Sequence, residues 1–210
     1  AFLYPGQGSQ ASGMGQFLFN EFKIAREIFE EASEAIHLDL KKLCFTGSAE
    51  ELSLTENTQP ALLTVSIATT KVLTNVIGVK PTITAGHSIG EYSSFVVAGV
   101  ISFSDAVKAV RARGQAMQSA VPVGKGGMTA TLGLDPEQVQ FLCQLAVDKS
   151  KCGPLSPANY NCDGQIVISG NSQALEWLKQ NFKSEMLPGE AKRAKLIPLQ
   201  VSAPFHCEMM

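Results

Sequence analysis

The stretch Gly86-His87-Ser88-Ile89-Gly90 decides the fold of this chain, because it has the form of a turn between a strand and a helix. The two glycines let the backbone reverse within five residues, and such a turn exposes the hydroxyl of the central serine. Where a helix begins, unpaired N–H groups and the helix dipole favour negative charge. The pentapeptide therefore predicts a nucleophile, Ser88, beside a site that stabilises an oxyanion.

The flanking sequence agrees with that turn. Residues 81–85 (PTITA) are a β-branched run that predicts a short strand, and residues 91–100 (EYSSFVVAGV) predict a buried helix. The alternative is a chance match to G-x-S-x-G in a chain that contains 18 glycines. The order of strand, turn and helix favours the catalytic interpretation.

Composition excludes several classes of protein. The 210 residues are 45% hydrophobic and 17% charged, which is typical of a soluble globular protein. The net charge of -2 gives no overall basic field, so we expect neither a nucleic-acid partner nor a membrane partner. Five scattered cysteines without a C-x-x-C motif predict reduced thiols and no metal site. Because no signal peptide or membrane-spanning run is present, we expect a cytoplasmic protein.

The first half of the chain predicts mainly helices. A short strand at residues 2–4 precedes a glycine-containing loop at residues 5–10 (PGQGSQ). Gln59 stands directly before Pro60, and it either reaches the site or caps and packs the helix that follows. Helical periodicity or start signals are found at residues 20–37, from Ser48, at 61–78 and from Ser104.

From about residue 127 the pattern changes to short alternating units. Strands are expected at 128–134, 165–169 and 196–199, and helices at 135–149 and 172–182. This alternation predicts a small α/β segment packed beside the main sheet. The glycine-rich residues 123–127 (VGKGG) lack the G-K-[ST] ending of a phosphate-binding loop.

A serine hydroxyl is a weak nucleophile at neutral pH, so the hypothesis needs a base. His37 follows an expected helix and is most simply a surface residue, while His87 adjoins Ser88 along a tight turn, where neighbouring side chains point in different directions. His206 lies in a loop after the last strand, and the order of serine first and histidine last is that of α/β-hydrolases. A lone histidine is often structural, but the absence of another candidate makes His206 the expected base.

Four separated motifs carry a family resemblance. They are GQGSQ at 6–10, GHSIGE at 86–91, Arg113-Gly114 followed by Met117-Gln118, and SAPFHC at 202–207. Together they resemble the malonyl-CoA:acyl carrier protein transacylases and the acyltransferase domains of fatty acid and polyketide synthases.

The resemblance implies an α/β fold in two parts. An α/β-hydrolase-like parallel-sheet core would comprise residues 1–122 and 194–210, and a small ferredoxin-like inserted subdomain would comprise residues 123–193. Members of this family continue well beyond the histidine, whereas this chain ends at Met210. We therefore expect a fragment whose core is truncated at its C-terminus.

The resemblance also implies the chemistry of the site. Ser88 would take an acyl group from coenzyme A, with His206 as its base and later its acid. The backbone N–H groups of Gln7 and Ile89 would form the oxyanion hole.

Arg113 matches the family arginine that holds the free carboxylate of a malonyl group, for which a planar guanidinium is suited. Phe205 resembles the malonyl-selective variant, in which bulk crowds an α-methyl branch. Gln59 and Asn161 match polar positions near the pocket.

The expected activity is therefore malonyl transfer to the phosphopantetheine thiol of acyl carrier protein in fatty acid or polyketide biosynthesis. The substrate is malonyl-CoA, the partner is acyl carrier protein, and no cofactor is expected. A serine thioesterase or acyl hydrolase with the same Ser-His pair is the alternative enzyme, although Arg113 argues against a generic esterase. An inactive module that binds the carrier is a further alternative.

Overall fold

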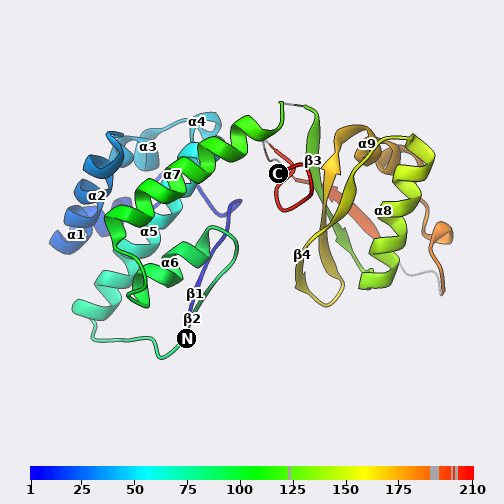
Figure 1. Cartoon of the computed structure of the whole chain (residues 1–210). Helices are drawn as coiled ribbons and strands as arrows, with labels where there is room; N and C mark the ends of the chain where they lie inside the picture. Colours follow the sequence, from blue (N-terminus) through cyan, green and yellow to red (C-terminus); the bar gives the residue numbers. More distant parts are fainter. Residues whose placement is uncertain (123, 190–193, 200, 202) are drawn as a thin grey trace. The chain divides into compact units, whose positions relative to one another are not determined.

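The computed structural model describes residues 1–122, 124–189, 194–199, 201 and 203–210, which form two compact units, residues 1–116 and 117–210 (Figure 1). Each unit is described by itself. The fold is α/β, as predicted: the first unit combines helices with a parallel pair of strands, and the second has an antiparallel sheet. The expected domain boundaries, at 122/123 and 193/194, stay predictions, and residues 123 and 190–193 lie outside the described residues.

The parallel pair of the first unit holds the serine turn. Strand β1 (Phe2–Tyr4) pairs with strand β2 (Thr84–Gly86), so that Tyr4 lies opposite Gly86. The His87 N–H extends this pairing by donating to the Tyr4 carbonyl at 3.0 Å. Helix α6 (Gly90–Val97) follows at once, which confirms the predicted order of strand, turn and helix.

The helices of the first unit share one apolar core. Helix α5 (Thr55–Asn75) is buried along most of its length, which its nearly uncharged sequence predicts, and it packs against the apolar face of α2 (Lys23–Ile36). The helix that the sequence places after Ser48 begins with a capping box between Ser48 and Glu51. The remaining helices are α1 (Gln16–Glu21), α2 (Lys23–Ile36), α3 (Leu40–Thr46), α4 (Ala49–Ser53) and α7 (Phe103–Ala120).

The helix expected at residues 20–37 was wrong as a single element. The structure has α1 and α2 there, separated by Phe22 in an extended conformation at φ -120° and ψ 120°. The Phe22 ring meets Phe17 edge to face, with centroids 6.4 Å apart. The apolar periodicity continues across this break, so the pattern alone does not reveal it.

Helix α5 begins six residues earlier than the expected start at residue 61, and Pro60 therefore lies inside it. Proline has no N–H, so the carbonyl of Glu56, four residues earlier, loses its helical donor. The Arg111 guanidinium replaces that donor, because its Nη1 lies 2.7 Å from the Glu56 carbonyl oxygen. This outside partner explains why the proline is tolerated.

The second unit is a four-stranded antiparallel sheet with two helices in the order βαββαβ, which is the predicted ferredoxin-like arrangement (Figure 1). The strand order is β4-β5-β3-β6. Its elements are β3 (Gly126–Leu132), α8 (Pro136–Ser150), β4 (Leu155–Cys162), β5 (Gln165–Asn171), α9 (Ser172–Asn181), a short 3₁₀ helix (Ser184–Met186) and β6 (Lys195–Pro198).

Strand β4 is the element that the sequence pattern misses. Its residues LSPANYNC contain a proline and two asparagines and do not alternate regularly, so the usual strand signal is absent. The structure places β4 at the edge of the sheet, with register shifts near Pro157 and Cys162. An edge position tolerates the proline because one side of the strand needs no hydrogen bonds.

No helix in the described ranges has the length and apolar character needed to cross a membrane. All five cysteines have free thiols, as the sequence predicts. Burial raises the pKa of Cys44 and of Cys143 to about 12, so these two thiols hold almost no thiolate at neutral pH.

Candidate active site

Ser88 occupies a turn that requires glycine two residues before it and two residues after it. Its φ of 51° lies in the left-handed region, which is rare for a residue other than glycine and is often found at functional sites. A Cβ on Gly86 would collide with the backbone of Gly90 and Glu91. A Cβ on Gly90 would collide with the Tyr4 carbonyl oxygen and would lie 2.9 Å from that of Pro5. Both glycines are therefore required to mount Ser88 where β1 ends.

Gly90→Ala is expected to lower the free energy of unfolding by about 1–3 kcal/mol and to reduce acyl loading of Ser88, because the new methyl group must push β1 away from the turn. The matched control is Gly127→Ala, whose Cβ would meet only the Leu175 Cδ1 atom, at 3.3 Å. Urea unfolding and labelling assays check this prediction. Equal effects of the two substitutions would contradict it.

The loop at residues 5–10 lies directly against this turn. A Cβ on Gly6 would collide with the His87 ring and lie 2.9 Å from the His87 carbonyl oxygen. Among the described residues, the backbone N–H groups of Gln7 and Ile89 donate to no backbone carbonyl in the turns and loops. Ile89 precedes the first turn of α6, so its N–H belongs to the positive end of that helix. One backbone donor thus lies within the serine turn, and the other lies in the loop packed against it.

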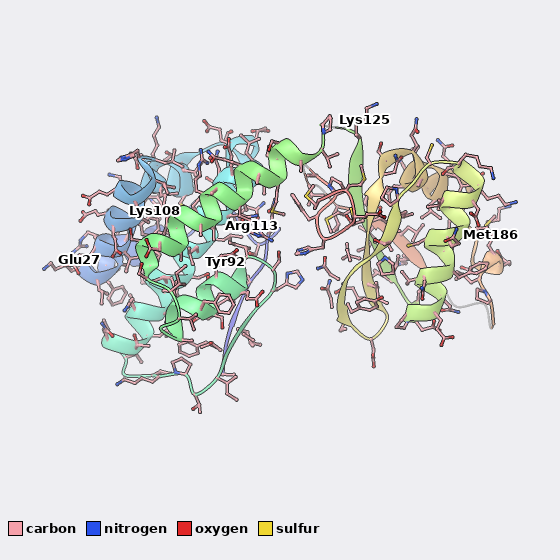
Figure 2. All side chains as sticks on the ribbon, in the orientation of Figure 1. Glu27, Tyr92, Lys108, Arg113, Lys125 and Met186 are labelled. Carbon is pink, nitrogen blue, oxygen red and sulfur yellow. The ribbon has the colours of Figure 1, made fainter. Side chains whose placement is uncertain are left out.

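Arg113 is the charged group that the structure brings to Ser88. Its Nη2 lies 3.5 Å from the Ser88 Oγ, which is a long contact, and its guanidinium lies 6.0 Å from the centre of the Tyr92 ring. Arg113 lies on α7 and Tyr92 on α6, and Figure 2 labels both residues in the first unit. The Nη1 of Arg113 is buried and has no hydrogen-bond partner among the described groups.

The electrostatics of Arg113 follow from its half-buried position. Desolvation lowers the pKa of its guanidinium, and the nearby Tyr92 and Glu91 partly oppose that shift. A guanidinium remains charged at physiological pH in spite of such a shift. A half-buried cation with an unused donor is unfavourable unless an anion pairs with it. The first unit therefore offers a site for a carboxylate next to a serine hydroxyl.

The other residues predicted for the site are divided between the units. Gln59 is fully buried on α5 in the first unit. His206, Phe205 and Asn161 belong to the second unit. His206 is exposed and has a left-handed backbone with φ 59°, whereas Phe205 is buried among Met128, Ala130 and Val167. Asn161 is exposed on β4. The structure thus brings together Ser88, Arg113 and the Gln7 loop, and their relation to His206 stays a prediction.

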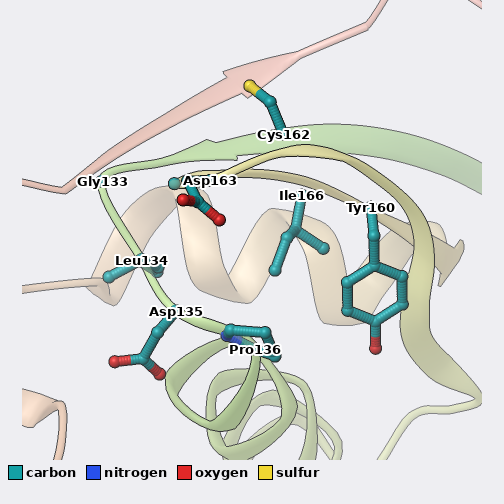
Figure 3. A pocket seen from close by; sticks show the side chains of 9 residues that line it. Gly133, Leu134, Asp135, Pro136, Tyr160, Cys162, Asp163 and Ile166 are labelled. Carbon is teal, nitrogen blue, oxygen red and sulfur yellow. The ribbon is translucent and has the colours of Figure 1, made fainter.

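The second unit also has a pocket of about 590 Å³ that contains none of the predicted site residues (Figure 3). It lies where β3 ends and where β4 turns into β5, and Tyr160, Asp163 and Pro136 are among the side chains that line it.

Sequence reasoning missed two residues beside Ser88 and Arg113. Tyr92 lies in the first turn of α6, four residues after Ser88, and its ring faces the Arg113 guanidinium. Arg111 contacts the first turn of α5, and the signal for it was Pro60, which frees a carbonyl four residues before itself whenever it lies within a helix.

Comparison with known proteins identifies the family of the chain. The acyl transferase domain family matches residues 1–194, and the chain belongs to that family. It is 48% identical to the malonyl CoA-acyl carrier protein transacylase of Bacillus subtilis strain 168, over the whole of this chain and 63% of that protein.

Solved structures of malonyl transacylases are also similar to this chain. The malonyl CoA-acyl carrier protein transacylase of Coxiella burnetii superposes with a TM-score of 0.89 and 40% identity, over 99% of this chain and 63% of that one. A malonyl-transacylase in complex with a type II polyketide synthase acyl-carrier protein superposes with a TM-score of 0.89 and 40% identity, over 100% of this chain and 65% of that one. The chain thus spans less than two thirds of the length of these relatives.

Proposed function

We propose that this protein is an acyltransferase that moves a malonyl group from coenzyme A, through an ester on Ser88, to the phosphopantetheine thiol of an acyl carrier protein. The observation that carries this proposal is the half-buried Arg113 guanidinium, which lies 3.5 Å from the Ser88 Oγ and keeps a buried Nη1 without a partner among the described groups. The malonyl group is an acyl group that ends in a carboxylate, so it suits a serine next to a cation. The names of the relatives agree with this substrate.

In the loading step, the Ser88 Oγ attacks the thioester carbonyl carbon and its proton passes to His206. The negative charge that develops on the carbonyl oxygen is stabilised by the backbone N–H groups of Gln7 and Ile89 and by the dipole of α6. The C–S bond then breaks, and the coenzyme A sulfur leaves with the proton from His206. The malonyl carboxylate pairs with Arg113 throughout.

In the discharge step, the carrier thiol gives its proton to His206 and attacks the Ser88 ester. The C–O bond breaks, and Ser88 regains its proton from His206. This exchange of one thioester for another through a serine ester needs no metal or cofactor in the proposed mechanism, because no electrons are gained or lost. Gln59, Asn161 and Phe205 complete the proposed pocket around the acyl group.

We further propose that this reaction takes place in the cytoplasm. The five free thiols support a reducing compartment.

The proposed function is tested by following a radiolabelled malonyl group from coenzyme A to the protein and then to the carrier. The protein is incubated with radiolabelled malonyl-CoA, the covalent adduct is isolated, and carrier protein bearing phosphopantetheine is then added. We expect a stable adduct that the carrier discharges, with the label appearing on the carrier. Release of free malonate with little adduct would instead indicate a hydrolase, and the absence of both would indicate an inactive module that binds the carrier.

A further inference from the structure

We infer that Arg111 is a positioning residue that sets the selectivity for the acyl group, because it anchors α7 to the first turn of α5 and so holds Arg113 beside Ser88. This inference rests on the proposed function. The polar partners of Arg111 are Glu56 and Asn57, on the first turn of α5.

The anchor uses a carbonyl that Pro60 leaves open. The Nη1 of Arg111 donates to the Glu56 carbonyl oxygen and to the Asn57 Oδ1, each at 2.7 Å. Its Nη2 lies 3.4 Å from the Glu56 carboxylate, and both side chains are mostly shielded, with exposed fractions of 22% and 31%. A planar guanidinium can serve three acceptors in this way, whereas an ammonium cannot match the geometry.

Close backbone packing makes the anchor rigid. A Cβ on Gly114 would lie 2.6 Å from the Glu56 Cα and 2.8 Å from the Thr55 carbonyl oxygen, so α7 touches the backbone of α5 at this point. The same turn of α5 also holds the Gln7 loop, because the Gln7 Nε2 donates to the Thr55 Oγ1 at 3.1 Å. Residues 55–57 are therefore a junction between α7 and the loop that carries one proposed oxyanion donor.

The contacts of Arg111 determine the direction of the Arg113 side chain through the geometry of α7. Successive residues turn by about 100°, so Arg111 and Gly114 share one face of α7 while Arg113 lies about 200° from Arg111. Because a helix turns as a unit, fixing its rotation at Arg111 and Gly114 fixes the direction in which Arg113 leaves it. A loss of the anchor would move the guanidinium relative to the Ser88 Oγ.

The test compares loading by malonyl-CoA with loading by acetyl-CoA, whose acyl group has no carboxylate. Arg111→Ala is expected to lower kcat/KM for malonyl loading roughly tenfold to a hundredfold, which is the cost of displacing a binding group by about 1 Å. Acetyl loading is expected to stay close to that of the unmodified protein. The matched control is Arg26→Ala, because the Arg26 Nη1 also donates to two carbonyls, those of Phe19 and Asn20, at 3.0 Å each.

A double-mutant cycle separates positioning from general damage. In an Arg113→Ala background, Arg111→Ala should cause no further fall in the ratio of malonyl to acetyl loading. An equal loss of both substrates, a loss of the ratio in Arg26→Ala, or an independent effect in the double mutant would each overturn the inference. If the unmodified protein failed to load malonyl at all, the proposed function would fail first.

A second pair of variants decides the matter if Arg111→Ala does not fold. Arg111→Lys keeps a positive charge near Glu56 but loses the planar fork, and Glu56→Gln removes the ion pair but keeps the backbone acceptor. We expect the ratio to fall more in Arg111→Lys than in Glu56→Gln, since the anchor is mainly the bond to the Glu56 carbonyl. An unchanged ratio in Arg111→Lys would overturn the inference.

Discussion

Ser88→Ala is expected to abolish the acyl adduct formed from radiolabelled malonyl-CoA and to lower transfer to the carrier by roughly 10⁴-fold or more, because no atom remains to form the ester. Alanine, like serine, is not β-branched, so we expect the turn to persist at a φ of 51°. Intact-protein mass spectrometry measures the adduct, and circular dichroism verifies that the variant is folded.

The control for this prediction concerns the exposed thiol of Cys162, which can exchange with a thioester and give a false label. Cys162→Ser removes that background and should leave the serine adduct intact. Neutral hydroxylamine distinguishes the two bonds, since it cleaves thioesters faster than esters. A hydroxylamine-resistant adduct that persisted in Ser88→Ala would show that the nucleophile is another residue.

Arg113→Ala should produce the second large effect, a loss of malonyl loading with acetyl loading preserved or raised. Removing one partner of a hydrogen-bonded charge pair in a binding site costs about 2–5 kcal/mol, which corresponds to roughly 30-fold to 4,000-fold in kcat/KM. Loading of a neutral acyl group is expected to rise when the cation is removed, because binding of such a group to the unmodified protein leaves the half-buried guanidinium without an anion.

The matched variant is Arg113→Lys, which retains the positive charge but has a single ammonium in place of the planar guanidinium. We expect malonyl loading intermediate between the unmodified protein and Arg113→Ala, with acetyl loading measured in the same assay. If Arg113→Ala kept its preference for malonyl over acetyl, Arg113 would not be the carboxylate partner, while the role of Ser88 would be unaffected.

Much of the fold follows from local sequence signals. The serine turn, the capping box at Ser48 and the Asp135 cap of α8 are each encoded within a few residues. The departures have non-local causes. Where helix α5 continues through Pro60, Arg111, more than fifty residues later, supplies the missing donor, and β4 pairs with the edge that β5 offers.

The candidate site likewise has residues that local sequence signals predict and residues that depend on tertiary packing. Ser88 could be predicted from a pentapeptide, because the steric requirement for glycine at both ends lies within that pentapeptide and its immediate contacts. Arg113 required the family resemblance, since an arginine on a helix is usually a solvated surface group. The contact of Tyr92 with its guanidinium and the anchor at Arg111 depend on how α5, α6 and α7 pack, which no local pattern specifies.

The left-handed conformation of Ser88 also restricts which side chains position 88 accepts. A β-branched side chain is strongly disfavoured at a φ of 51°, so threonine, although it has a hydroxyl, is excluded from position 88 by the backbone alone. Cysteine has no such branch and fits the same turn. At position 88 the backbone therefore accepts a cysteine, which would carry an acyl group as a thioester, but not the secondary alcohol of a threonine.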